Sequence, residues 1–161
     1  MAILPVNVND SPNYTPAEHA DHHNVLHAFN NAQSGFGHTL GYAQAVANQG
    51  SIGGSDTDLT NLSVTVTVPS GARIKITGHV VFSQASASGI TRLRIKESTT
   101  QLADSLLSAT NGSFYSVDAF AVLTPTAGSH TYKLAMTTTP GTATMEAGAT
   151  FPAFILVEDI T

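Results

Sequence analysis

From Leu40 onward, the chain follows a two-residue period of apolar and polar side chains. Valine alternates with threonine over Val64–Val68, and apolar residues alternate with cations over Arg92–Lys96. Successive side chains of a β-strand point to opposite faces, so this alternation predicts strands with one buried and one exposed face. The same pattern or a short apolar run predicts further strands at 42–47, 73–77, 101–107, 114–123, 132–136, 142–149 and 153–158.

Turn-forming residue pairs separate these runs. The pairs are Gly53-Gly54, Ser88-Gly89, Asn111-Gly112, Ala127-Gly128 and Pro140-Gly141. They favour tight turns because glycine accepts backbone conformations that other residues avoid. Eight or nine short strands at this spacing predict an all-β domain over residues 38–161, built as an antiparallel β-sandwich of the jelly-roll type.

The last predicted strand, in residues 151–157, is apolar on both faces. A strand with one face in water alternates, so both faces of this strand are expected to be covered. Packing of subunits around a symmetry axis would cover the second face. We therefore expect a homo-oligomer with Phe154 and Leu156 in its interface. The alternative is that a loop or an N-terminal helix of the same chain covers this face.

Residues 1–37 lack the strand pattern and are predicted to form a separate attachment segment. The first 14 residues read as an extended arm, and Thr15-Pro16-Ala17-Glu18 predicts the start of a short α-helix, with Thr15 as its cap. The helix is expected to run to about Asn30, and its small apolar face needs another surface to pack on. The residues expected to contact a partner are Ile3, Leu4, Val6, Tyr14, Leu26 and Phe29.

Composition and charge exclude several classes of protein. Only 11% of the 161 residues are charged, against roughly 25% in an ordinary soluble protein, which suggests exposed sheet or surface buried in an assembly. Six cations and a net charge of −5 do not provide the basic patch that nucleic-acid binding needs. The absence of cysteine excludes disulfides and thiolate sites. Because neither a membrane span nor a secretory signal is evident, we expect a soluble protein made in the cytoplasm.

The sequence contains no recognisable catalytic motif. The glycine-rich stretch 50–54 fits neither a phosphate-binding loop nor a dinucleotide-binding fingerprint. The carboxylates Asp104, Asp118 and Glu146 occur singly, so no glycosidase pair can be selected, and each is interpreted as a turn or solvent-facing residue. We expect no enzymatic activity and no cofactor.

Three histidines are the only candidate metal ligands. His19, His23 and His27 would share one face of the predicted helix at a spacing that a metal site can use. The alternative is a polar face whose imidazoles bind water or neighbouring chains and titrate near neutral pH. We favour the second interpretation and expect no bound metal.

Several segments resemble a known family. They are Leu59–Gly78, Leu123–Leu134, Pro152–Ile160 and the predicted helix at Ala17–Ala28, which contains Ala-Asp-His-His-Asn. Together they resemble the small β-sandwich domains of virion structural proteins from tailed bacteriophages, notably phages of actinobacteria. The resemblance implies a jelly-roll or tumour-necrosis-factor-like sandwich that forms a homotrimer on the virion surface.

Two roles are compatible with this resemblance. The first is a capsid decoration, or cement, protein that grips the phage major capsid protein through residues 1–37. The alternative is a minor tail or tail-tip protein that binds other tail proteins and adheres to host glycans. Decoration is the role we expect. A long fibre or a tail lysin is not expected, because the chain is short and has no collagen-like repeat, long coiled coil or enzymatic module.

Overall fold

The structure is a computed structural model and describes residues 38–161. The predicted arm, the predicted helix, the six expected contact residues within them and the three candidate metal ligands all lie outside the described residues. The described part of the chain consists of ten strands joined by turns and loops, and it contains no helix.

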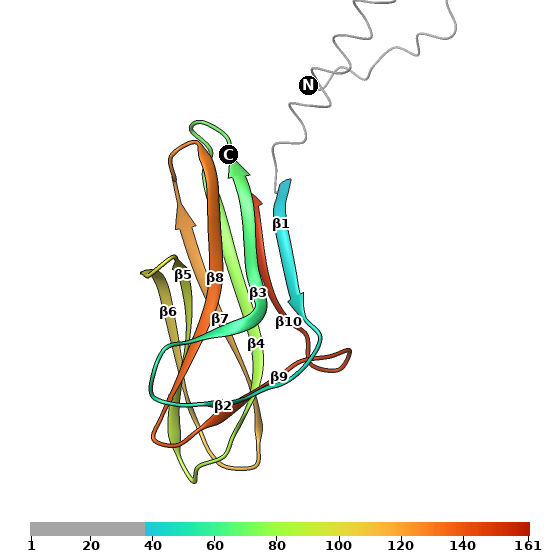
Figure 1. Cartoon of the computed structure of the whole chain (residues 1–161), viewed down its shortest axis with the longest axis vertical. Helices are drawn as coiled ribbons and strands as arrows, with labels where there is room; N and C mark the ends of the chain where they lie inside the picture. The colour runs from blue at the N-terminus through green and yellow to red at the C-terminus, as the bar shows by residue number, and fades with distance from the viewer. Residues whose placement is uncertain (1–37) are drawn as a thin grey trace, which may run out of the picture. The chain divides into compact units, whose positions relative to one another are not determined.

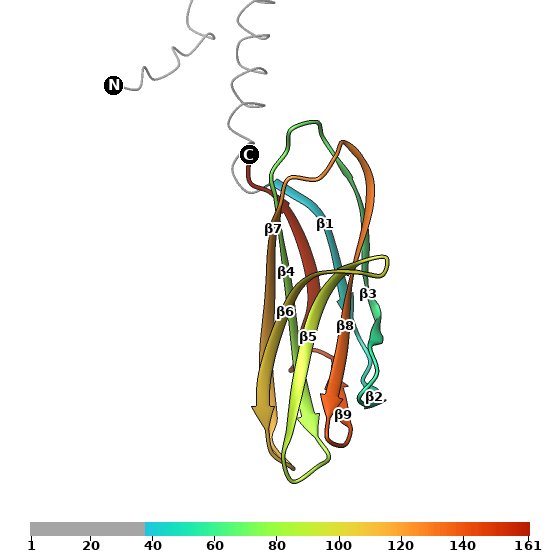
Figure 2. The same ribbon diagram turned by 90° about the vertical axis from the view of Figure 1, so that its left-hand side faces the viewer.

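The ten strands form two sheets that pack face to face (Figures 1 and 2). The first sheet contains β1 (His38–Ala45), β10 (Ala153–Asp159), β4 (Ile74–Gln84), β7 (Phe114–Leu123), β9 (Ala143–Glu146) and β2 (Gln49–Ile52). The second sheet contains β3 (Thr57–Val68), β8 (Gly128–Thr139), β5 (Gly89–Glu97) and β6 (Thr100–Ala109). All pairs between these strands are antiparallel.

The strand pairs are nested along the chain. The innermost pair is β5 with β6, followed by β4 with β7, β3 with β8 and, outermost, β1 with β10. The order β1-β10-β4-β7 therefore faces the order β3-β8-β5-β6. Nested antiparallel pairing across two sheets defines a jelly-roll-like sandwich, and the predicted fold class is confirmed to that extent.

The strand boundaries differ from the predictions where alternation is weak. The short strand β2 overlaps the glycine-rich stretch, for which no strand was predicted because its sequence, Gln-Gly-Ser-Ile, has no apolar period. It is a strand by virtue of its pairing with β9. The run predicted at 142–149 ends as a strand at Glu146. Conversely, β4 continues to Gln84, because its buried and half-buried residues alternate along its whole length.

Inward-facing residues of both sheets form one core. In β4, Ile74, Ile76, Val80 and Phe82 are fully buried, as the alternating pattern predicts. Gly78 occupies the inward position between them, and a Cβ atom there would lie 2.5 Å from Cδ2 of a core leucine in β8. Such a distance is too short for two carbon atoms, so glycine allows the two sheets to approach at this point.

Candidate functional site

The outer side of the first sheet carries a group of large apolar side chains. Tyr42 lies beside Leu156, and Phe120 follows on the far side of Thr77, so the group crosses β1, β10, β4 and β7. We define the apolar face as Tyr42, Phe120, Val122, Phe154 and Leu156. The exposed fractions of Tyr42, Phe120 and Val122 are 53%, 57% and 49%, whereas Phe154 and Leu156 are half-buried by their neighbours.

Aromatic contacts hold the apolar face together. The ring of Phe154 stacks against Tyr42 on β1 at a centroid distance of 5.9 Å and against His79 on β4 at 5.5 Å. The ammonium group of Lys75 lies 5.8 Å from the ring centroid of Phe120. Because neighbouring strands contribute to each contact, the sheet itself positions these rings, and the apolar face is formed before any partner binds.

A few polar groups lie among these apolar side chains. His79 Nδ1 is 2.7 Å from a carboxylate oxygen of Asp118, and Lys75 pairs with Glu158 at 3.9 Å. The Thr77 hydroxyl, in the middle of the sheet, is buried and has no hydrogen-bond partner. An apolar patch that contains isolated polar pairs has the composition of a protein–protein interface.

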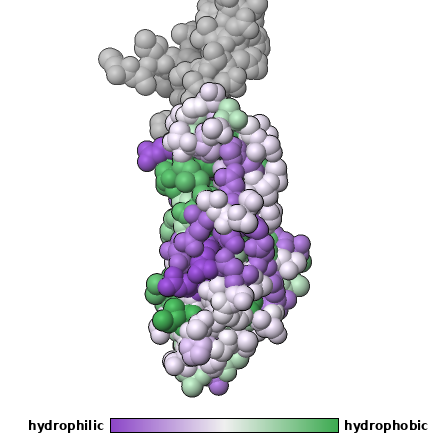
Figure 3. Space-filling view, turned by 60° about the vertical axis from the view of Figure 1, so that its left-hand side comes forward, coloured by the Kyte–Doolittle hydropathy of each residue, from purple (hydrophilic) through white to green (hydrophobic). Residues whose placement is uncertain are grey.

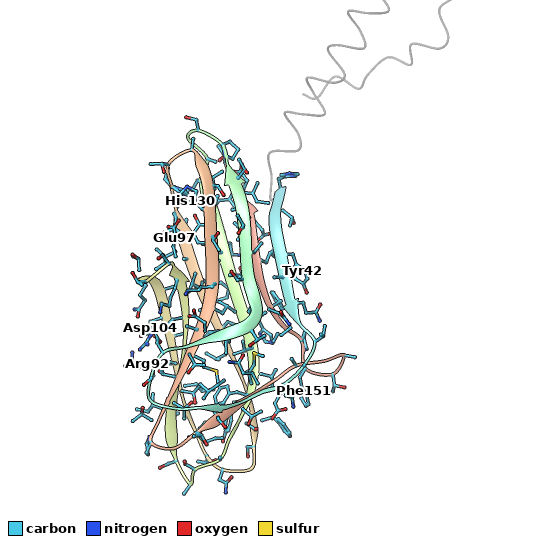
Figure 4. All side chains as sticks on the ribbon, viewed as in Figure 1. Tyr42, Arg92, Glu97, Asp104, His130 and Phe151 are labelled. Atoms are coloured by element: carbon cyan, nitrogen blue, oxygen red, sulfur yellow. The ribbon has the colours of Figure 1, made fainter. Side chains whose placement is uncertain are left out.

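The outer face of the second sheet is mainly polar, with Ile90 on β5 and Leu106 on β6 as its exposed large apolar side chains. Its cations lie on β5 and β8, as the alternation predicts, and pair with acidic residues. The pairs are Arg92 with Asp104, Arg94 with Asp56 and Asp104, Lys96 with Asp56, and Lys133 with Asp58. Figure 3 shows the resulting hydrophilic zone near the middle of this face, and Figure 4 labels Arg92 and Asp104 within it.

The electrostatics of Asp56 show how well these charges are matched. Partial burial alone would raise the pKa of its carboxyl group. Hydrogen bonds and charge interactions with Lys96 and Arg94 outweigh that effect and hold the pKa below its ordinary value. The second face is therefore neutralised by its own ion pairs. The first face, whose apolar surface has no such compensation, is the candidate functional site.

The structure places both predicted interface residues on the apolar face. Phe154 and Leu156 point outward from β10, while Ala153, Ile155 and Val157 point into the core. The strand is thus apolar on both sides, as predicted. What covers its outer side in solution remains a prediction.

Two further residues of the apolar face lie on β7 and were not predicted there. In this strand Ala119 and Ala121 are buried, whereas the larger Phe120 and Val122 point outward. Ordinary alternation places large apolar residues inside and small or polar residues outside. The reversed order of size over residues 119–122 is the sequence signal that could have identified them.

The single carboxylates predicted as turn or solvent-facing residues all have partners. Asp104 forms an ion pair with Arg92, and Asp118 lies within hydrogen-bond distance of His79 Nδ1. Glu146 accepts hydrogen bonds from the Ser83 hydroxyl, at 2.7 Å, and from the Asn48 amide. These partners are 12 to 98 positions away along the chain, so local sequence could not reveal them. All three carboxylates serve structural contacts within the described strands.

Within 38–161, no group of three or more histidine, aspartate or glutamate side chains is placed to hold a metal ion. In the same range, no helix has the length and hydropathy needed to cross a membrane.

Comparison with known proteins finds structures with low sequence identity and low structural similarity to this chain. Neither a protein-family model nor a curated protein matches the chain. Among solved structures, the Stig cyclase Fisc from Fischerella sp. TAU is 13% identical, with a TM-score of 0.43 over 62% of this chain and 56% of that chain. This chain therefore spans only about half of the cyclase's length.

Two other similar structures come from different classes of protein. The carbohydrate-binding module CBM6cm-2 of Cellvibrio mixtus lichenase 5A is 18% identical, with a TM-score of 0.39 over 76% of this chain and 99% of that chain. A chain of infectious bursal disease virus, Gx strain, is 13% identical, with a TM-score of 0.39 over 75% of this chain and 38% of that chain. Similarities of this size carry no activity, ligand or partner to the present protein.

Proposed function

We propose that the apolar face is the subunit interface of a homotrimer. Its five residues come from β1, β7 and β10 and present adjoining apolar surface outside a core that is already complete. Burial of such surface against copies of itself is favourable, and cyclic symmetry lets each copy contribute the same residues. The apolar face is the single observation that supports this assembly. The number of three subunits is taken from the resemblance to phage virion proteins.

We further propose that this trimer is a structural protein of a tailed bacteriophage, displayed on the virion surface as a capsid decoration protein. Residues 1–37 would grip the major capsid protein, and the sandwiches would project outward. Each copy would add buried area across the seams between capsid subunits. Because the trimer would bind the assembled shell and not the free subunits, it would stabilise the shell against pressure from packaged DNA by mass action.

Cryo-electron microscopy of intact particles tests this role directly. The particles are those of the phage whose genome encodes this sequence. Decoration predicts trimeric density at regular threefold positions over the head. Density only at the tail would reject decoration and favour a minor tail or tail-tip protein, for which adhesion to host glycans becomes the next question.

Removal of residues 1–37 is expected to separate attachment from assembly. The remaining sandwich keeps its core and its apolar face, so it should fold and form trimers. It should no longer sediment with decoration-free capsids, whereas the full chain should. Capsid binding by the truncated protein at the level of the full chain would contradict an attachment role for this segment.

A further inference from the structure

His130 is held between two acceptors near the end of the sandwich where β1 begins (Figure 4). Its Nδ1 atom is 2.7 Å from a carboxylate oxygen of Glu97, at the end of β5. Its Nε2 atom is 2.8 Å from the carbonyl oxygen of Thr126, in the loop between β7 and β8. Neither an ionised carboxylate nor a carbonyl has a proton to donate, so both ring nitrogens must donate. Only the imidazolium form can do so.

The surroundings of the ring contribute one charged group. Glu97 faces it from β5, and the phenol ring of Tyr132 lies parallel to it on β8, with a centroid distance of 6.0 Å. Burial and the charge of Glu97 raise the pKa of Tyr132 to about 12, so the phenol stays neutral at physiological pH. On the other side, β3 places the apolar Val66 opposite the histidine. The loop itself, residues 124–127, contains no titratable side chain.

We propose that His130 acts as a protonation-dependent latch, in which its imidazolium ring ties the 124–127 loop to the end of β5. A neutral ring keeps one N–H, and the charged carboxylate of Glu97 is the stronger acceptor for it. The lone pair of Nε2 then faces the carbonyl oxygen of Thr126 with no proton between them. Two acceptors at that distance repel each other, so the loop moves away from the ring.

The direction of the pH dependence follows from the same contacts. The hydrogen bond to Glu97, with a further contribution from the Thr126 carbonyl, raises the pKa of His130 above its ordinary value of 6.5. A group whose folded-state pKa is raised stabilises the fold fully below the unfolded-state value. That stabilisation is lost as the pH rises through the folded-state pKa. The latch is therefore closed in mildly acidic solution and opens toward alkaline pH.

Nuclear magnetic resonance on the full chain tests the latch, with the histidine rings and the backbone labelled. The ring of His130, assigned by its loss in His130→Gln, should titrate above the ordinary histidine pKa of 6.5. The backbone amide signals of Thr126 and Ala127 should shift with the same midpoint as the His130 ring. In His130→Gln, the pH dependence of these loop signals should disappear.

Two further variants keep the test decisive if His130→Gln fails to fold. Glu97→Gln removes the carboxylate and should lower the titration midpoint of His130, and the midpoint of the loop signals should fall with it. His38→Gln is the matched control and should leave the loop titration unchanged. The latch is refuted if the pKa of His130 is not raised above its ordinary value, or if the loop signals do not follow its protonation. These outcomes are independent of the proposed trimer and of capsid binding, since they concern contacts within one chain.

Discussion

Replacement of Leu156 by aspartate is expected to convert the proposed trimer into folded monomers. The side chain points out of β10 at the centre of the apolar face, between Tyr42 on one side and Thr77 on the other. In the trimer the new carboxylate would be buried without a partner, at a cost of about 3 kcal/mol or more for each subunit. Since each 1.4 kcal/mol weakens association about tenfold, sedimentation velocity at micromolar concentration should show monomers.

A matched control distinguishes loss of the interface from loss of the fold. Thr67 lies on the outer side of β3 in the second sheet, where it is exposed. Thr67→Asp introduces the same charge on the outer side of the other sheet and should leave the proposed trimer intact. Both variants should keep the circular dichroism spectrum of the parent. A trimeric Leu156→Asp would show that a different surface joins the subunits, and a monomeric parent would favour coverage of the apolar face by the chain's own residues.

The largest expected loss of stability comes from truncation of Phe82 to alanine. Phe82 is fully buried on β4 and stacks against Tyr115, with ring centroids 5.7 Å apart. Removal of a buried phenyl ring forfeits its transfer free energy and leaves a cavity between the sheets, which together lower the free energy of unfolding by about 3–5 kcal/mol. Urea unfolding measures this loss, at one fixed protein concentration because association contributes to apparent stability.

Phe114→Ala is the matched control for this prediction. Phe114 lies on β7 next to the strand that carries Phe82, but its side chain points outward and is 57% exposed. It stacks on Phe151 at a centroid distance of 4.9 Å, so its truncation should lower the free energy of unfolding by only about 1 kcal/mol. Equal losses for the two phenylalanines would contradict the inward placement of Phe82.

Much of the fold follows from alternation along single strands. The run Arg92–Lys96 identifies its own buried and exposed faces, and the structure places Leu93 and Ile95 in the core and the cations outside. A strand is recognisable in this way because one of its faces packs in the core and the other is exposed to water. The strand β2 has no such contrast, since its pairing with β9 comes from the assembled sheet and not from its own side chains.

The candidate site was only partly predictable. Phe154 and Leu156 are recognisable because their strand is apolar on both sides, whereas a strand with one face in water alternates. Phe120 lies between two inward-facing alanines, so its large side chain suggests a place in the core, although it faces outward. The contact of His130 with Glu97 joins residues 33 positions apart. Contacts of this kind arise from strand register, which no local pattern specifies.

The outermost strand pair has a consequence for how the molecule folds. β1 starts at His38, and among the described strands it pairs with β10 alone, which ends at Asp159. During synthesis, β1 therefore leaves the ribosome long before the strand that completes its hydrogen bonding. Contacts between residues so far apart close large loops and are slow to form. The first strand of the sandwich is thus incorporated into its sheet only after β10 has been synthesised, although it is made before every other described strand.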